Sequence, residues 1–147
     1  MGSVTDGRVL QGQVIVPGAA SGVALVSHEP LSFWGGYDYH TGEIIDRRHP
    51  LSVQIAAGRV LAVPFTRGSS TTTAVLLESV KAGTAPAALL TTGPDTFFAL
   101  ASVVADELYG RPIPLVALTE SDFALLATGQ QVAVTAAGQV TLGVLPA

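Results

Sequence analysis

The apolar residues of this chain form short runs bounded by turn residues, and the first half of the chain contains only runs of strand type. Residues 9–16 and 22–26 are rich in β-branched side chains and are bounded by Gly, Pro and Ser. They predict two strands joined by a Gly/Ala/Ser turn. Residues 60–63 are uninterrupted apolar and predict a buried strand.

Helical patterns begin after this strand. Residues 70–82 predict a helix that ends at Gly83, and Asp95 predicts the N-cap of a second helix that ends at Gly110. Apolar residues at helical spacing predict the buried faces of both helices. The expected faces are Ala74, Leu77 and Val80 in the first helix and Phe97, Phe98, Ala101, Val104, Ala105 and Leu108 in the second.

The remaining runs predict strands at 87–90 and 113–118, a short helix at 121–128 and a hairpin at 131–142. The order is therefore a β-rich first half, then alternating strands and helices, then a hairpin. Repeated strand–helix units imply parallel pairing, and the flanking β segments imply a mixed layer. We expect one α/β domain over residues 1–147, with a partly parallel sheet or half-barrel and covering helices.

Between residues 29 and 50 the periodicity disappears, and aromatic, glycine, acidic and histidine residues concentrate there. Long irregular segments in compact domains tend to carry function. We interpret this one as a polar lid or docking loop anchored by Phe33 and Trp34. The spacing of His28, His40 and His49 matches no compact metal-ligand motif, so no metal site is predicted.

The composition of the chain predicts that it binds a partner chain. Of the 147 residues, 48% are hydrophobic and only 12% are charged, which favours a surface partly covered by another chain. A monomer with an ordinary apolar surface is the alternative. The net charge of −4, without a basic cluster, disfavours nucleic-acid binding. No apolar stretch approaches 18 residues and no signal peptide is recognisable, so we expect a cytoplasmic protein without membrane association.

The sequence contains no cysteine. Disulfides, a catalytic thiol and thiolate ligation of zinc or iron–sulfur clusters by this chain are excluded. Any such cofactor would have to be held by another chain.

The candidate chemistry centres on residues 64–73, which lead from the strand at 60–63 into the first helix. A helix N-terminus favours anions, Arg67 adds a cation, and Gly68 permits close backbone approach. Ser69 and Ser70 add hydroxyl groups, so the loop predicts an anion site with a proton-transfer group. The alternatives are a helix cap for the serines and a surface or interface ion pair for Arg67.

Two stretches together resemble the swivel domain, or small subunit, of the aconitase X group of dehydratases. The first is residues 29–36 followed by Asp38, Thr41, Gly42, Asp46 and His49, and the second is Arg67-Gly68-Ser69-Ser70 before a helix. The resemblance covers essentially the whole chain in order. It implies a swivelling β/β/α domain that closes over an active site whose iron–sulfur cluster is bound by cysteines of a large subunit.

The resemblance also implies a reaction, the elimination of water from a hydroxy acid. The expected substrate is cis-3-hydroxy-L-proline, and mevalonate 5-phosphate is the alternative. The family's proton acceptor matches Ser69, although the roles of Ser69 and Ser70 remain interchangeable, and Arg67 with Gly68 is expected to orient a substrate carboxylate. In a second hypothesis the chain is a non-catalytic carboxylate-binding module.

The segment 29–50 supplies further candidates for pocket lining or subunit contact, and the resemblance does not decide between these two roles. They are Ser32, Phe33, Trp34, Gly35, Gly36, Asp38, Thr41, Asp46 and His49.

Overall fold

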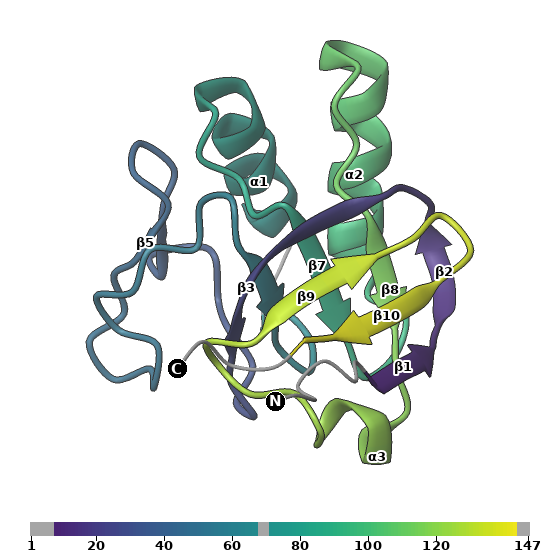
Figure 1. Cartoon of the computed structure of the whole chain (residues 1–147). Coiled ribbons are helices and arrows are strands. Elements are labelled where there is room, and N and C mark those ends of the chain that lie inside the picture. Colours follow the sequence, from purple (N-terminus) through teal and green to yellow (C-terminus); the bar gives the residue numbers. More distant parts are fainter. Residues whose placement is uncertain (1–7, 68–70, 144–147) are drawn as a thin grey trace.

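The computed structural model describes residues 8–67 and 71–143, which form a mixed sheet with helices packed on it (Figure 1). The strands are β1 (Arg8–Gln11), β2 (Gln13–Val16), β3 (Ala20–Val26), β4 (Tyr37–Asp38), β5 (Glu43–Ile44), β6 (Val60–Ala62), β7 (Ala88–Thr91), β8 (Leu115–Ala117), β9 (Gln131–Val134) and β10 (Gln139–Leu142). The helices are α1 (Thr71–Ala82), α2 (Thr96–Tyr109) and α3 (Glu120–Phe123).

Eight of these strands form one sheet in the order β1-β10-β9-β3-β6-β7-β8-β2. The four central strands β3, β6, β7 and β8 are parallel, and the flanking pairs are antiparallel. The two end strands, β1 and β2, are consecutive in the chain, so the sheet curls into a nearly closed half-barrel. The predicted partly parallel sheet or half-barrel with covering helices is confirmed.

Gly12 is the point at which the predicted strand 9–16 divides. β1 pairs with β10, whereas β2 pairs with β8, so the prediction of one strand is wrong. A Cβ atom at Gly12 would lie 2.2 Å from Cγ1 of Val116, which excludes a larger residue where the chain crosses between the two ends of the sheet.

Both faces of the central strands are buried. In β6 and the residue after it, Leu61 and Val63 enter one core cluster, whereas Val60 and Ala62 enter the other. Alternate side chains of a strand point to opposite faces, so a strand buried on both sides needs an uninterrupted apolar run. The first cluster lies under α1 and α2, and the second fills the half-barrel.

The helix boundaries follow the predicted signals. α1 is followed by Gly83, and α2 is capped by the Asp95 carboxylate, which accepts from Phe98 N, and by Gly110 in the left-handed conformation (φ 63°). Ser70, the predicted cap of α1, lies outside the described residues. Figure 1 shows the two helices side by side.

The predicted buried faces are only partly correct. In α1, Ala74 is exposed, and the buried side chains are Thr72, Thr73, Leu76, Ser79 and Val80. In α2, Phe98, Ala101 and Ala105 are buried as predicted, but Leu108 is 62% exposed.

The remaining predicted elements are present with shorter bounds. The strands predicted at 87–90 and 113–118 are β7 and β8, the short helix is α3, and the hairpin is β9–β10. Within the described residues, no helix is long and apolar enough to span a membrane.

Residues 29–55 form a lobe of turns around the two-stranded pair β4–β5 (Figure 1). Phe33 anchors this lobe, because its fully buried ring stacks on Tyr37 at 4.8 Å and meets Phe98 edge-on at 5.4 Å. A Cβ atom at Gly36 would lie 2.0 Å from the Ser32 carbonyl oxygen, so the turn after Phe33 requires glycine. Residues 33–37 are therefore held in place by packing and by the glycine turn.

Candidate functional site

The two motif stretches identified in the sequence meet at the carboxyl ends of the parallel strands. Residues 27–32 follow β3, and residues 63–67 follow its parallel neighbour β6. The backbone N–H of Arg67 donates to the Leu31 carbonyl oxygen at 3.0 Å, and Leu31 forms an isolated parallel bridge with Thr66. This edge of an open α/β sheet is where ligands bind in many folds.

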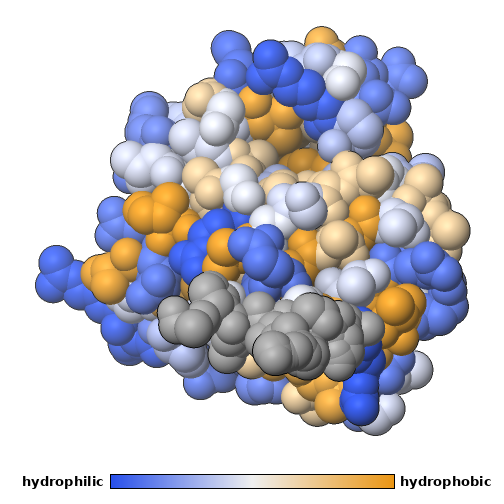
Figure 2. All heavy atoms as spheres, viewed as in Figure 1, coloured by the Kyte–Doolittle hydropathy of each residue, from blue (hydrophilic) through white to orange (hydrophobic). Residues whose placement is uncertain are grey.

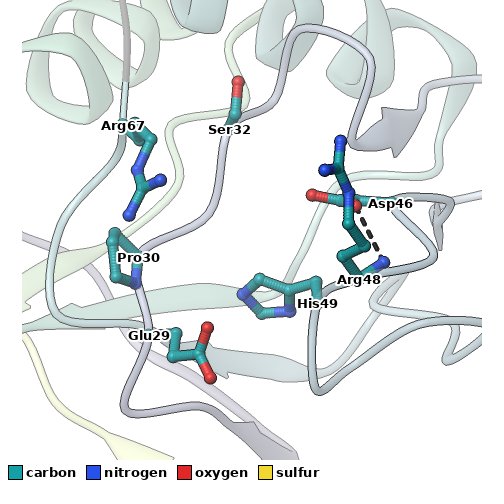
Figure 3. A pocket seen from close by; sticks show the side chains of 7 residues that line it. All are labelled: Glu29, Pro30, Ser32, Asp46, Arg48, His49 and Arg67. Carbon is teal, nitrogen blue, oxygen red and sulfur yellow. Dashed lines mark hydrogen bonds between the residues drawn. The ribbon is translucent and has the colours of Figure 1, made fainter.

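A pocket of about 330 Å³ opens at this edge (Figure 3). It is lined by three segments of the chain. The lining residues are Glu29, Pro30, Ser32, Asp46, Arg48, His49 and Arg67. In Figure 3, Arg67 lies on one side of the pocket, Asp46, Arg48 and His49 lie on the other, and residues 29–32 run between them. Its volume suits a small molecule.

Asp46 shapes the wall opposite Arg67. Its carboxylate accepts from the backbone N–H of Arg48 at 3.0 Å, the bond drawn dashed in Figure 3, and its carbonyl oxygen accepts from His49 N at 3.1 Å. A side chain that bonds the backbone two residues on fixes a tight turn. Asp46 therefore directs both Arg48 and His49 toward the pocket.

His49 is the most buried polar side chain of the pocket, with 7% of its surface exposed. Its Nδ1 accepts from the backbone N–H of Leu51 at 3.1 Å. Its Nε2 is buried and has no hydrogen-bond partner. Figure 3 shows the ring extending from its own loop toward Glu29 and Pro30.

Arg67 is exposed and follows a fixed residue. Thr66 is buried, and both its backbone N–H and its hydroxyl donate to the Asp95 carboxylate, at 2.7 Å and 2.9 Å. Within residues 8–67 and 71–143, the Arg67 guanidinium has no hydrogen-bond or ion-pair partner. The predicted residues Gly68, Ser69 and Ser70 lie outside the described residues.

Several other candidates of the sequence analysis lie away from this pocket. Phe33 is a core residue, but Trp34 is 72% exposed, so the prediction that Trp34 also anchors the loop is wrong. Asp38 and Thr41 each bond the backbone two residues on, accepting from His40 N and Glu43 N respectively. Gly35 and Gly36 shape the turn after Phe33, Gly35 with a φ of 76°.

Glu29 and Arg48 line the pocket although the sequence analysis did not select them as site residues. Glu29 begins the 29–36 motif and Arg48 precedes the selected His49, so the signal available was proximity to motif residues. With Asp46 and Arg67 they give the pocket two carboxylates and two guanidinium groups, whose formal charges cancel. The hydrogen bonds among the described residues leave the Glu29 carboxylate unpaired.

The residues present do not fit a metal or iron–sulfur cluster. Among the described residues, no three His, Asp or Glu side chains are grouped so that they could hold a metal ion. The sequence has no cysteine to bind a cluster. Of the titratable groups outside the pocket, Tyr37 is notable, because burial raises the pKa of its hydroxyl, which donates to the Thr84 carbonyl oxygen at 2.7 Å.

Comparison with known proteins gives consistent matches. A family model described as the aconitase X swivel domain matches residues 9–142. The chain is 49% identical over 108 residues to a cis-3-hydroxy-L-proline dehydratase of Pseudomonas aeruginosa, covering 74% of the chain but 19% of that protein. A dehydratase of the same name from Hypocrea jecorina is 42% identical over 124 residues, covering 84% of the chain and 21% of that protein. The chain thus spans about a fifth of these two relatives.

Other relatives have about the length of this chain. The phosphomevalonate dehydratase small subunit of Thermococcus onnurineus is 37% identical over 127 residues, covering 86% of the chain and 92% of that protein. The crystal structure of Thermococcus kodakaraensis aconitase X in its holo form matches with a TM-score of 0.83 and 34% identity, covering 92% of this chain and 98% of the matched chain.

Proposed function

The chain belongs to the aconitase X swivel-domain family, and from that premise we propose that it is the small, swivelling part of a dehydratase that eliminates water from a hydroxy acid. The observation that carries the proposal is the pocket that brings Arg67 together with His49, where the 29–36 motif meets the end of β6. An unpaired guanidinium and an imidazole with an unpaired Nε2 in one pocket suit a carboxylate.

The work is divided between this chain and a large subunit. Relatives of similar length are named small subunits, which supports such a partner. Because this chain has no cysteine, an iron–sulfur cluster would be bound by the large subunit. The tasks of this chain are to bind and orient the substrate carboxylate and to accept a proton.

Ser69 is the proposed proton acceptor, for the hydrogen on the carbon next to the substrate carboxylate. It stands two residues after Arg67 and two before Thr71, the first residue of α1. A serine is a weak base unless its alkoxide is stabilised, and a helix N-terminus and a neighbouring guanidinium both stabilise negative charge. Ser70 has the same neighbours, so the two serines must be tested separately.

The charge balance of the pocket favours hydroxyproline over mevalonate 5-phosphate as the substrate. The pocket is lined by two arginines, Arg48 and Arg67, and by two carboxylates, Glu29 and Asp46, so its positive and negative charges are equal in number. A zwitterionic imino acid presents one carboxylate and one ammonium group, which matches both signs. A ligand with a phosphate and a carboxylate would bring an excess of negative charge beside Glu29 and Asp46.

Exposed apolar side chains that stand close in sequence to pocket-lining or anchoring residues support a partner chain. Trp34 is 72% exposed, Phe65 50% and Ile45 43%, and each stands within two residues of a pocket-lining or anchoring residue. Large apolar side chains exposed together mark interaction surfaces. On the face in Figure 2, apolar residues are interspersed with polar ones over the lobe that carries β5 in Figure 1.

The test is reconstitution with a candidate large subunit and assay of water elimination from both substrates. We expect turnover of cis-3-hydroxy-L-proline, and a Ser69→Ala change should lower kcat by about 10²–10⁴-fold. Ser21→Ala, at an exposed serine of β3, is the matched control and should retain activity. A similar loss in Ser70→Ala alone would move the base to Ser70, and normal turnover in both variants would contradict a serine base.

The second candidate is a non-catalytic carboxylate-binding module, which is favoured by one observation: Arg67 and His49, the two side chains suited to a carboxylate, both line this pocket. Gel filtration with the candidate large subunit separates the two functions. A stable complex supports the dehydratase. Persistent separate elution, together with carboxylate binding by the chain alone, supports the module.

A further inference from the structure

All polar atoms of His49 except one have a hydrogen-bond partner. Its backbone N–H donates to the Asp46 carbonyl oxygen at 3.1 Å, and its own carbonyl oxygen accepts from Ser52 N at 3.0 Å. Its Nδ1 accepts from Leu51 N at 3.1 Å. The exception is Nε2, which is buried and unpaired.

The bond from Leu51 determines where the imidazole proton lies. A backbone N–H can only donate, so Nδ1 must be the acceptor and cannot carry a hydrogen. In the neutral imidazole the hydrogen is then on Nε2. His49 is therefore fixed as a hydrogen-bond donor whose N–H has no acceptor, and a buried donor without an acceptor is unfavourable.

The pocket offers the place for that acceptor. His49 lies across the cavity from Arg67, and Figure 3 shows its ring extended toward the pocket side formed by Glu29 and Pro30. The Asp46 turn and the Leu51 bond hold the ring in this direction from two sides. The Nε2–H of His49 and the unpaired guanidinium of Arg67 line the same pocket. Two such donors suit the two oxygens of a ligand carboxylate.

We propose that His49, as its Nε2–H tautomer, donates a hydrogen bond to the carboxylate that Arg67 also binds, and that it positions the substrate ring for proton removal. The identity of the ligand rests on the proposed dehydratase function. The tautomer and the direction of the donor rest on the structure alone. His49 thereby has a role distinct from that of a base, because its available atom already carries hydrogen.

The tautomer is measured by nitrogen NMR of the complete chain with isotope-labelled histidine, alone and in complex with the large subunit. We expect the Nε2–H pattern for His49 at neutral pH. Addition of L-proline, which has the ring and the carboxylate, should shift the Nε2–H resonance, whereas pyrrolidine, which lacks the carboxylate, should not. An Nδ1–H tautomer, or equal responses to the two ligands, overturns the proposal.

Two substitutions separate the donor from the structural acceptor. The amide nitrogen of Gln overlies Nε2, so His49→Gln keeps a donor to the ligand; the amide oxygen of Asn overlies Nδ1, so His49→Asn keeps only the bond from Leu51. In the reconstituted enzyme, we expect His49→Asn to raise KM at least 10-fold and His49→Gln to stay within about 3-fold. His40→Asn, at an exposed histidine outside the pocket, is the control.

Equal KM values in both His49 variants, whether normal or raised, overturn the proposal. Circular dichroism of each variant checks that the chain is folded. If a variant is unfolded, the NMR comparison of L-proline with pyrrolidine decides whether His49 donates to the carboxylate. A wild-type complex that does not turn over hydroxyproline would contradict the proposed function. The tautomer and the proline-dependent shift would still decide the role of His49.

Discussion

Asp95 and Thr66, 29 residues apart in the chain, are joined by three hydrogen-bond contacts directly before the pocket-lining Arg67. The Asp95 carboxylate accepts from Thr66 N at 2.7 Å and from the Thr66 hydroxyl at 2.9 Å and 3.2 Å. The same carboxylate accepts from Phe98 N in the first turn of α2. The cap of α2 thus also fixes the residue that precedes Arg67.

Replacing Asp95 should destabilise the chain more than replacing its partner. Asp95→Ala leaves three donors without an acceptor in a buried place, and we expect a loss of about 2–4 kcal/mol in the free energy of unfolding. Thr66→Val removes only the hydroxyl and should lower it by about 1 kcal/mol. Urea denaturation measures both. Equal losses would mean that the bonds to the two backbone N–H groups contribute nothing.

Glu29 is expected to distinguish an imino acid from a phosphate ligand. Its unpaired carboxylate faces the pocket, so Glu29→Gln should raise KM for hydroxyproline about 3–10-fold through loss of the ammonium contact. The same change removes a negative charge and should leave or improve the weak binding of mevalonate 5-phosphate. Glu43→Gln, outside the pocket, is the control. Steady-state kinetics that show parallel changes for both substrates would contradict this role.

Tyr37 should make the chain less stable at alkaline pH. Burial raises the pKa of its hydroxyl above the ordinary value of 10.0, so above that pH the unfolded chain releases a proton that the folded chain retains. Stability is then fully present below pH 10 and falls as the pH rises, with a slope approaching about 1.4 kcal/mol per pH unit from this group.

The measurement is the free energy of unfolding between pH 9 and 11, with Tyr37→Phe as the comparison. The variant lacks the hydroxyl that donates to Thr84 and should be less stable at pH 8, but its stability should fall less steeply above pH 10. Identical slopes in the two proteins would contradict the assignment.

Val53 has an unfavourable backbone conformation that a single change should relieve. It is the one described non-glycine residue with a positive φ, at 66°, and its side chain is 70% exposed. The left-handed region suits Asn far better than a β-branched residue, so Val53→Asn should raise the free energy of unfolding by about 0.5–1 kcal/mol.

Val103→Asn is the matched control for this change. Val103 is 52% exposed on α2, where Val and Asn have similar helix propensities, so its stability should change little. Thermal unfolding of both variants measures the difference. A loss of stability in Val53→Asn would mean that the Val53 side chain makes contacts worth more than the strain.

Trp34 should contribute to binding of the large subunit. Trp34→Ala removes a mostly exposed side chain two residues after the pocket-lining Ser32, and should weaken the complex at least 10-fold while leaving the stability of the separate chain nearly unchanged. Leu108→Ala, at an exposed apolar position on α2, is the control. Affinity is measured by calorimetric titration of the two subunits. Equal affinity of the wild type and Trp34→Ala would exclude Trp34 from the interface.

The features predictable from the sequence were those with local causes. Asp95 and Gly110 mark the ends of α2 because a cap and a left-handed residue act on their own turn. The division of the first strand at Gly12 could not be read from the apolar pattern, because it depends on closure of the sheet against Val116. The buried face of α1 was predicted only in part, because Thr73 and Ser79 are buried with their hydroxyls bonded to carbonyl oxygens.

The site was predictable as two separate stretches but not as a pocket. Both motifs contain lining residues, yet only the parallel pairing of β3 with β6 brings Arg67 beside Leu31. The importance of His49 Nε2 also appears only in space, because it depends on the direction of the Leu51 N–H. Residue type and spacing carry no information on which imidazole nitrogen already accepts a hydrogen bond.

The pairing of β1 with β10 places Arg8 opposite Leu142, so both ends of the described domain emerge at one point on its surface. A linker attached at either end would therefore start from the same place on the domain. The domain could move over nearly the same distance on either linker. A circularly permuted chain, joined across this point by a short linker, should keep the sheet intact. The same geometry is compatible with the occurrence of related domains both inside much longer proteins and as separate small subunits.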